Sequence, residues 1–127
     1  MTAPTKNYVE FILDQLAALR AVKCGPFFGG MGLTLDRTQF AMLMGNSLYF
    51  VVDEVTRPKY EKLGSHCFSY QTKKGRVDVK RYYLVPANLI DDPEQLVALA
   101  RESIGVASSS GVSAKRRSAR PSAKRRR

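Results

Sequence analysis

The sequence has 127 residues, of which 44% are hydrophobic, and a formal net charge of +10 at pH 7. This length and composition are ordinary for one globular domain with its own core. No apolar run approaches the ~18 residues that a membrane helix needs, and the N-terminus lacks a secretory signal, so we expect a cytoplasmic protein that does not bind membranes.

The charge is concentrated at the C-terminal end. Residues 1–105 contain 13 Lys or Arg and all 11 acidic residues, whereas residues 106–127 contain eight basic residues and no acid. The second segment is rich in Ser and Ala and has no aromatic residue, so it buries too little apolar area to offset the entropy of ordering it. We therefore predict a folded domain over residues 1–105 and a disordered basic tail over residues 106–127.

A helix is the first predicted element. Apolar residues recur at the helical period over residues 7–20, and Asn7 with Glu10 three positions later resembles a capping box. The run Lys-Cys-Gly-Pro at 23–26 predicts the end of this helix.

The stretch 27–53 predicts three antiparallel strands. Its apolar runs, around Leu33–Leu35, Phe40–Met44 and Leu48–Val52, are separated by turn residues in the manner of hairpins. The second and third runs are apolar at nearly every position, which predicts central strands covered on both faces.

A short helix with Thr56 as N-cap follows, and its Tyr60 and Leu63 are expected to face the sheet. Two more strands are predicted at 67–70 and 77–85 around a Lys-Lys-Gly turn. A last helix begins after Asp92 and ends at Gly105. The order predicts an α+β, two-layer domain with a mainly antiparallel sheet of about five strands and three helices (α-β3-α-β2-α).

An ordered set of short motifs across residues 8–104 resembles the TfoX/Sxy family, N-terminal domain. The stretches FGGMGL (28–33), LYFVVDE (48–54), RPKY (57–60), RYYLVP (81–86) and DDP (91–93) carry the resemblance. The residues that match the family motifs, and for which we expect structural roles, are Phe28, Gly29, Gly30, Gly32, Asp53, Arg57, Tyr82, Tyr83 and Pro86.

This resemblance implies a fold similar to the type III secretion-chaperone class and a non-enzymatic role. Members of the family regulate competence for DNA uptake and act as transcriptional co-regulators alongside a cyclic-AMP receptor protein. It therefore implies a transcription regulator as protein partner, and it leaves a homodimer open.

Candidate chemical sites each have a structural alternative that we favour. The stretch 29–32 is glycine-rich, but no helix N-terminus follows to bind phosphate, so a close-packed bend is expected. His66 and Cys67 are adjacent on a strand and point to opposite faces. Cys24 and Cys67 are both expected to be small, reduced core or near-core residues. The close acids at Asp53 and Asp92 are expected to cap helices. We expect no catalytic residue, metal or cofactor.

Two basic regions are candidates for nucleic-acid binding. One is the second hairpin, where Lys73, Lys74 and Arg81 lie near Tyr82 and Tyr83 and could hold phosphates and stack bases. Its alternative is a solvated edge hairpin whose lysines discourage edge pairing.

The other region comprises eight residues near the C-terminus, here called the C-terminal cations: Lys115, Arg116, Arg117, Arg120, Lys124, Arg125, Arg126 and Arg127. With no acid among them, they should attract a polyanion, most simply DNA, without reading its sequence. With what the resemblance implies, this predicts a TfoX-type competence co-regulator that binds nucleic acid through its tail, and it leaves association with the nucleoid open. The alternative is an interaction module or chaperone-like adaptor with no physiological nucleic-acid role.

Overall fold

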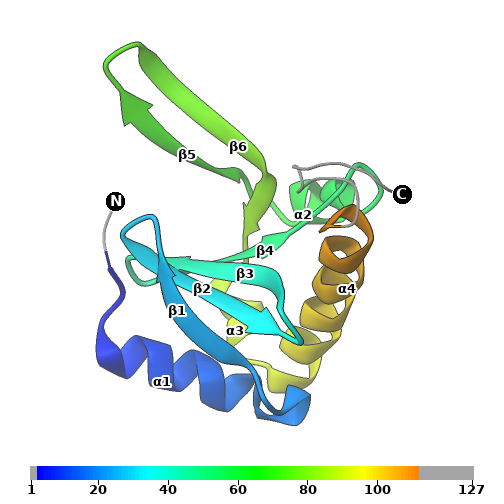
Figure 1. The fold of residues 1–127 in the computed structure, drawn as a ribbon. Coiled ribbons are helices and arrows are strands. Elements are labelled where there is room, and N and C mark those ends of the chain that lie inside the picture. Colours follow the sequence, from blue (N-terminus) through cyan, green and yellow to red (C-terminus); the bar gives the residue numbers. More distant parts are fainter. Residues whose placement is uncertain (1–2, 112–127) are drawn as a thin grey trace.

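Six strands form one antiparallel sheet in the order β1-β2-β3-β4-β6-β5 (Figure 1). The computed structural model describes residues 3–111. The strands are β1 (Lys23–Phe27), β2 (Gly30–Leu35), β3 (Thr38–Met44), β4 (Ser47–Val51), β5 (Cys67–Thr72) and β6 (Gly75–Leu84). Strands β1 and β5 lie at the two edges, and the β5–β6 hairpin extends beyond the rest of the sheet (Figure 1).

Helices cover one face of this sheet. They are α1 (Lys6–Gln15), α2 (Arg57–Lys62), α3 (Ala87–Ile90) and α4 (Pro93–Gly111), with a 3₁₀ turn, η1, at Ala17–Leu19. Helix α4 packs along β3 and β4, and both α1 and α3 contact α4 (Figure 1). The α+β, two-layer architecture that the sequence predicts is confirmed.

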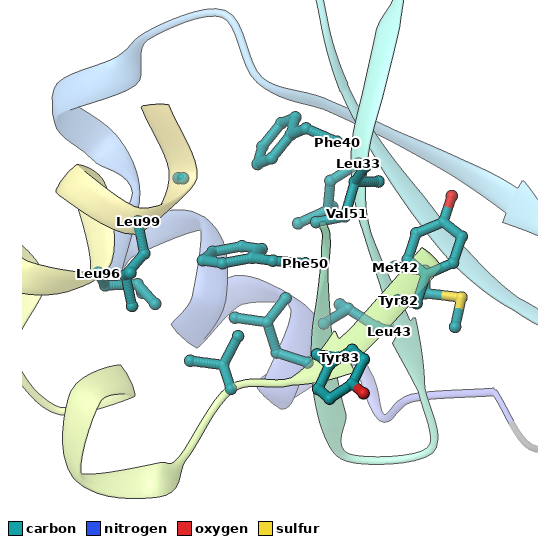
Figure 2. Close-up of a cluster of buried hydrophobic side chains, with 14 of the residues drawn as sticks. Leu33, Phe40, Met42, Leu43, Phe50, Val51, Tyr82, Tyr83, Leu96 and Leu99 are labelled. Atoms are coloured by element: carbon teal, nitrogen blue, oxygen red, sulfur yellow. The ribbon is translucent and has the colours of Figure 1, made fainter. Parts of the chain in front are cut away.

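The core lies between α4 and the sheet. Leu96 of α4 and Phe50 of β4 are both fully buried, and Figure 2 shows them on the same side of the strands. Met42 and Tyr82 point to the opposite side (Figure 2). Fully burying one such large apolar side chain stabilises the fold by ~1.5–3 kcal/mol. The apolar run on β3 therefore serves both faces of the sheet.

Strand β1 replaces the predicted helix break at residues 23–26. The sequence predicted about five strands, and the structure has six. Gly25 and Pro26 are residues that commonly end a helix, but here they lie in β1. Among the described strands, β1 pairs with β2 and with no other. An edge strand has hydrogen-bonding partners on one side only, so it tolerates a residue without an N–H.

The first helix is shorter than predicted, and its cap is a different residue. Thr5 caps α1, because its hydroxyl accepts a hydrogen bond from the Tyr8 N–H at 3.2 Å, so the expected capping box at Asn7 is wrong. The chain leaves the helix through η1 and turns into β1 at Arg20 and Ala21, which both have positive φ. The four-residue helix α3 was not predicted.

Helix α2 follows the sequence more closely. Pro58 lies in its first turn, Gly64 after it has a φ of 83°, and Tyr60 is buried. Leu63, however, is 47% exposed, so the prediction that it faces the sheet is wrong. Leu63 is the C-cap residue, where the backbone has already left the helical conformation.

Helix α4 does not end at Gly105, as the sequence predicted, but continues to Gly111. Before Gly105 in the sequence, the Ser103 hydroxyl hydrogen-bonds to backbone carbonyls of β3 and β4. After Gly105, Ala107 is 3% exposed, so it is packed into the core. These contacts outweigh the ~1 kcal/mol that glycine costs in a helix interior. The first six residues of the predicted disordered tail are therefore helical, and residues 112–127 lie outside the described residues.

Candidate interaction surface

An apolar groove lies on the sheet face that carries Met42 and Tyr82. Its cavity volume is ~180 Å³, and strands and one turn supply all of its walls. The lining residues, which define the apolar groove here, are Phe27, Phe28, Met42, Met44, Phe68, Tyr70, Val79 and Tyr82. Aromatic rings and flexible methionines together make a surface that can adapt to an apolar ligand.

A second hollow, the basic cleft, adjoins this groove. Phe27 and Tyr82 line both of them. The remaining walls of the basic cleft, whose volume is ~560 Å³, come from Arg37, Thr38, Gln39, Arg81, Ala107 and Ser108. Two exposed arginines thus lie at one end of an apolar surface, an arrangement that suits a ligand with both apolar and anionic groups.

The cations predicted in the second hairpin separate into two places. Lys73 and Lys74 are exposed in the β5–β6 turn, whereas Arg81 lies at the basic cleft near the other end of β6. Between them, Arg76 pairs with Asp78 at 2.8 Å. The structure therefore does not bring the three predicted residues into one patch.

The tyrosines of that hairpin do not form a stacking surface, so this part of the prediction is wrong. Tyr82 is 8% exposed and its hydroxyl accepts a hydrogen bond from Gln39 Nε2 at 3.1 Å. Tyr83 is 5% exposed and donates to Glu61 Oε2 at 2.8 Å. Burial, followed by the Glu61 contact, raises the pKa of Tyr83 to about 12. Both rings are therefore buried parts of the hydrophobic core and are not exposed for stacking on bases.

The glycine-rich motif is structural, as the sequence analysis favoured. Phe28 and Gly29 form the turn between β1 and β2, and both have positive φ. A Cβ on Gly30 would overlap the Leu43 carbonyl oxygen, and one on Gly32 would lie 2.6 Å from Gln39 Oε1. Gly30 thus allows β2 to approach the backbone of β3 closely, and Gly32 leaves room for the Gln39 side chain. Both glycines lie within strand β2, and no helix N-terminus follows the motif directly.

Three other family-motif residues also have structural positions. Asp53 accepts hydrogen bonds from the N–H groups of Val55 and Thr56, at 3.0 and 2.9 Å, and the Thr56 N–H is the main reason that the Asp53 pKa is lowered. Arg57 opens α2, and its Nε is buried without a hydrogen-bond partner among residues 3–111. Pro86 is the N-cap residue of α3.

Asp92 immediately precedes α4. Its carboxylate accepts hydrogen bonds from the backbone N–H and the side-chain amide of Gln95. The side-chain bond is the largest cause of the lowered pKa of Asp92. The prediction that Asp92 caps a helix is therefore confirmed. Asp53 instead bonds to N–H groups of the turn before α2, whose N-cap residue is Thr56 and has no side-chain capping bond, so that part of the prediction is wrong.

The remaining candidates for chemistry do not converge. His66 is exposed, and both cysteines are free. Cys24 is exposed on edge strand β1, so the expectation that it is a core or near-core residue is wrong. Within residues 3–111, no group of three or more His, Cys, Asp or Glu residues could hold a metal ion.

Arg37 is the residue of this surface that the sequence reading missed. It was read only as part of a polar turn, and its φ of 68° places it in the β2–β3 turn together with Asp36. That turn brings Arg37 to the same cleft as Arg81, which lies 44 positions later in the sequence. No local pattern reveals that proximity. The C-terminal cations lie outside the described residues.

One antiparallel sheet with helices on one face, the apolar groove on the other and the basic cleft reaching from that groove to the end of α4 defines a small α+β domain with an open sheet face. The chain belongs to the TfoX N-terminal domain family, whose model matches residues 14–107. A search of the curated proteins found no match. None of the described helices combines the length and hydropathy that a membrane crossing requires.

Proposed function

We propose that this protein is a non-enzymatic regulator of the TfoX type, which promotes competence for DNA uptake by acting on transcription with another regulatory protein. The observation that carries this proposal is the family match over residues 14–107. In this proposal the folded domain binds the protein partner, and the C-terminal cations hold nucleic acid, in the cytoplasm and near the nucleoid.

The charge distribution supports this division of roles. The 13 basic and 11 acidic residues of positions 1–105 nearly balance, so the domain has no strong overall attraction for a polyanion. The C-terminal cations carry eight charges without an acid among them. Such a segment binds phosphates regardless of base sequence, so it would position the protein on DNA while the domain supplies specificity through its partner.

A DNA gel-shift titration at two salt concentrations tests the role of the C-terminal cations. The full chain is compared with a full-length variant in which all eight are replaced by glutamine. If every cation meets a phosphate, the logarithm of the DNA association constant of the full chain falls with log[salt] at a slope of about −7, which is the steepest value that eight contacts allow. The variant should lose most of this salt dependence.

The control is the double variant Lys6→Gln/Lys62→Gln, which removes two exposed cations from α1 and α2, outside both candidate regions. It should bind DNA almost as the full chain does. Equal affinity and equal salt slope for the full chain and the eight-glutamine variant would contradict a nucleic-acid role of this segment.

A second candidate function is a protein-interaction adaptor for which nucleic acid is incidental. The apolar groove favours it, because an apolar hollow on an open sheet face suits a protein ligand. Capture of partners from cell lysate, with and without nuclease treatment, separates the two functions. Association that survives nuclease, with no DNA binding by the full chain at ~0.15 M salt, supports the adaptor, and DNA binding at that salt supports the nucleic-acid role.

A further inference from the structure

The turn between β1 and β2 carries an aromatic residue that costs folding stability. Phe28 has a φ of 48° and is 72% exposed. In a two-residue turn with both φ values positive, asparagine or glycine is the favoured first residue, and a bulky side chain is strained. Because strain of this kind collects at functional sites, Phe28 is a candidate contact residue.

Phe28 lies at the wall of the apolar groove. Its ring packs edge-on against Phe27 with centroids 4.7 Å apart, and both rings form one wall of the apolar groove. Phe68 and Tyr70 of β5 are on the hairpin that forms another wall. A cavity of about 150 Å³ accepts a benzene ring, so the ~180 Å³ groove has room for one aromatic or branched apolar side chain.

The basic cleft supplies the electrostatic part of the surface. The two ion pairs of the described residues, Lys59–Glu102 and Arg76–Asp78, involve neither Arg37 nor Arg81. Asp36 is the acidic neighbour of Arg37 in the turn and forms no ion pair with it within residues 3–111. Neither guanidinium is held by a carboxylate of the described residues, although that of Arg81 hydrogen-bonds to Tyr82, so both can pair with carboxylates of a ligand.

We infer that the apolar groove and the basic cleft together bind an acidic peptide segment of a partner protein, with one large apolar side chain in the groove and neighbouring carboxylates on Arg37 and Arg81. Charge argues against this protein's own C-terminal segment as the occupant. Residues 112–127 contain the C-terminal cations, which the two arginines would repel, and no aromatic residue. This inference rests on the proposed role of the domain in binding a protein partner.

Selection from a library of random 12-residue peptides displayed on phage tests the inference, with the full-length eight-glutamine variant as bait so that the C-terminal cations do not themselves retain acidic peptides. Enriched peptides should place Phe, Trp or Leu within a few residues of Asp or Glu. Enrichment of basic peptides, or none above bait-free beads, would overturn it. A synthetic, fluorescein-labelled copy of the most enriched peptide is then the probe for affinity measurements.

Phe28→Asn is the decisive variant, because asparagine tolerates the positive φ that strains phenylalanine. Its thermal midpoint should equal or exceed that of the wild type, while the probe binds about tenfold more weakly or worse. Val55→Asn, at an apolar residue that is 84% exposed and lies outside both hollows, is the matched control and should leave binding unchanged. Equal losses in the two variants would count against the groove.

Arg37→Gln and Arg81→Gln test the electrostatic part. Each should weaken binding of the probe and reduce its salt dependence, and replacing the acids of the probe by amides should remove the difference. Binding that depends on Phe28 but on neither arginine would overturn the acidic character of the ligand.

A second copy of this chain is the other possible occupant of the groove and cleft, and analytical ultracentrifugation tests for it by measuring self-association. Self-association that Phe28→Asn abolishes, without peptide binding, would replace the proposed partner by a homodimer. The eight-glutamine variant should bind the probe as the full chain does, so this test and the gel-shift experiment fail independently.

Discussion

At the scale of single residues, Asp53 shows how one carboxylate organises the junction of β4 and α2. It accepts hydrogen bonds from two backbone N–H groups, and the Thr56 hydroxyl lies 3.2 Å from the same oxygen. The Thr56 hydroxyl in turn accepts a bond from the Asp53 N–H at 3.1 Å. This reciprocal arrangement resembles a cap and holds the chain as it leaves the sheet.

Replacement of Asp53 should change both stability and its dependence on pH. Asp53→Ala should lower the free energy of unfolding by about 1 kcal/mol, because the N–H groups of Val55 and Thr56 lose their hydrogen-bond acceptor. Because the folded-state pKa is lowered, the charge of Asp53 stabilises the fold at pH values above its unfolded pKa, and this contribution is lost as pH falls through the folded pKa.

Asp53→Asn isolates the charge, since the amide oxygen still accepts a hydrogen bond. Chemical denaturation between pH 2 and 7 should show a smaller loss of stability in acid for this variant than for the wild type. Glu54→Gln, at the exposed neighbour, is the matched control. An acid profile of Asp53→Asn identical to that of the wild type would contradict this role.

At the scale of elements, α4 is held by contacts that are distant in the sequence. The buried Ser103 hydroxyl lies 2.7 Å from the Phe40 carbonyl oxygen and 3.0 Å from that of Val51, which ties the helix to β3 and β4. Gly105 lies on the exposed side, where an added Cβ would meet nothing within 4 Å. Helix α4 therefore continues through Gly105, although glycine is a residue at which many helices end.

Two glycine substitutions should have opposite effects. Gly105→Ala should raise the free energy of unfolding by about 0.5–1 kcal/mol, because alanine is the better helix former and has room there. Gly30→Ala should lower it, because the new Cβ overlaps backbone of β3. Thermal and urea unfolding of both variants checks the signs, and a destabilising Gly105→Ala would show that α4 does not extend through this position.

The same elements show what the sequence could and could not predict. The apolar runs of β3 and β4 and the cap at Asp92 are local patterns, and the structure confirms them. Strand β1 was not predicted because Gly25 and Pro26 indicate a break when only neighbouring residues are considered. Pairing with β2 outweighs that local preference. The end of α4 was misplaced because Ser103 bonds to residues more than 50 positions away.

At the scale of the whole molecule, the tyrosines couple folding to alkaline pH. Burial is the largest cause of a raised pKa at each of five of them, namely Tyr8, Tyr49, Tyr60, Tyr82 and Tyr83. As pH rises past 10, the unfolded chain loses these phenolic protons before the folded chain does. Stability should therefore be intact below pH 10 and decline above it.

Tyr83→Phe tests this coupling at the residue whose pKa is raised to about 12. The variant loses the hydrogen bond to Glu61 and should be less stable at neutral pH. Between pH 10 and 12 its stability should fall less steeply than that of the wild type, because one titrating group is gone. Denaturant midpoints at several pH values check both statements, and parallel profiles would contradict the second.

The candidate surface was less predictable than the fold. Its walls come from the β1–β2 turn, from β3 and from the β5–β6 hairpin, so residues between 27 and 82 meet only after the sheet has formed. The hairpin cations were visible in the sequence, yet the burial of Tyr82 and Tyr83 was not, because a Tyr-Tyr pair on a strand can face either way.

The edge position of β5 has a consequence for handling the protein. This strand, Cys67–Thr72, contains neither proline nor a charged residue, and it pairs only with β6. An outer strand of this kind offers unpaired amides to any extended chain that meets it. Lys73 and Lys74 sit immediately beyond its end and repel a like-charged neighbour, so concentrated stocks should stay clear longest in low-salt buffer below the pKa of lysine.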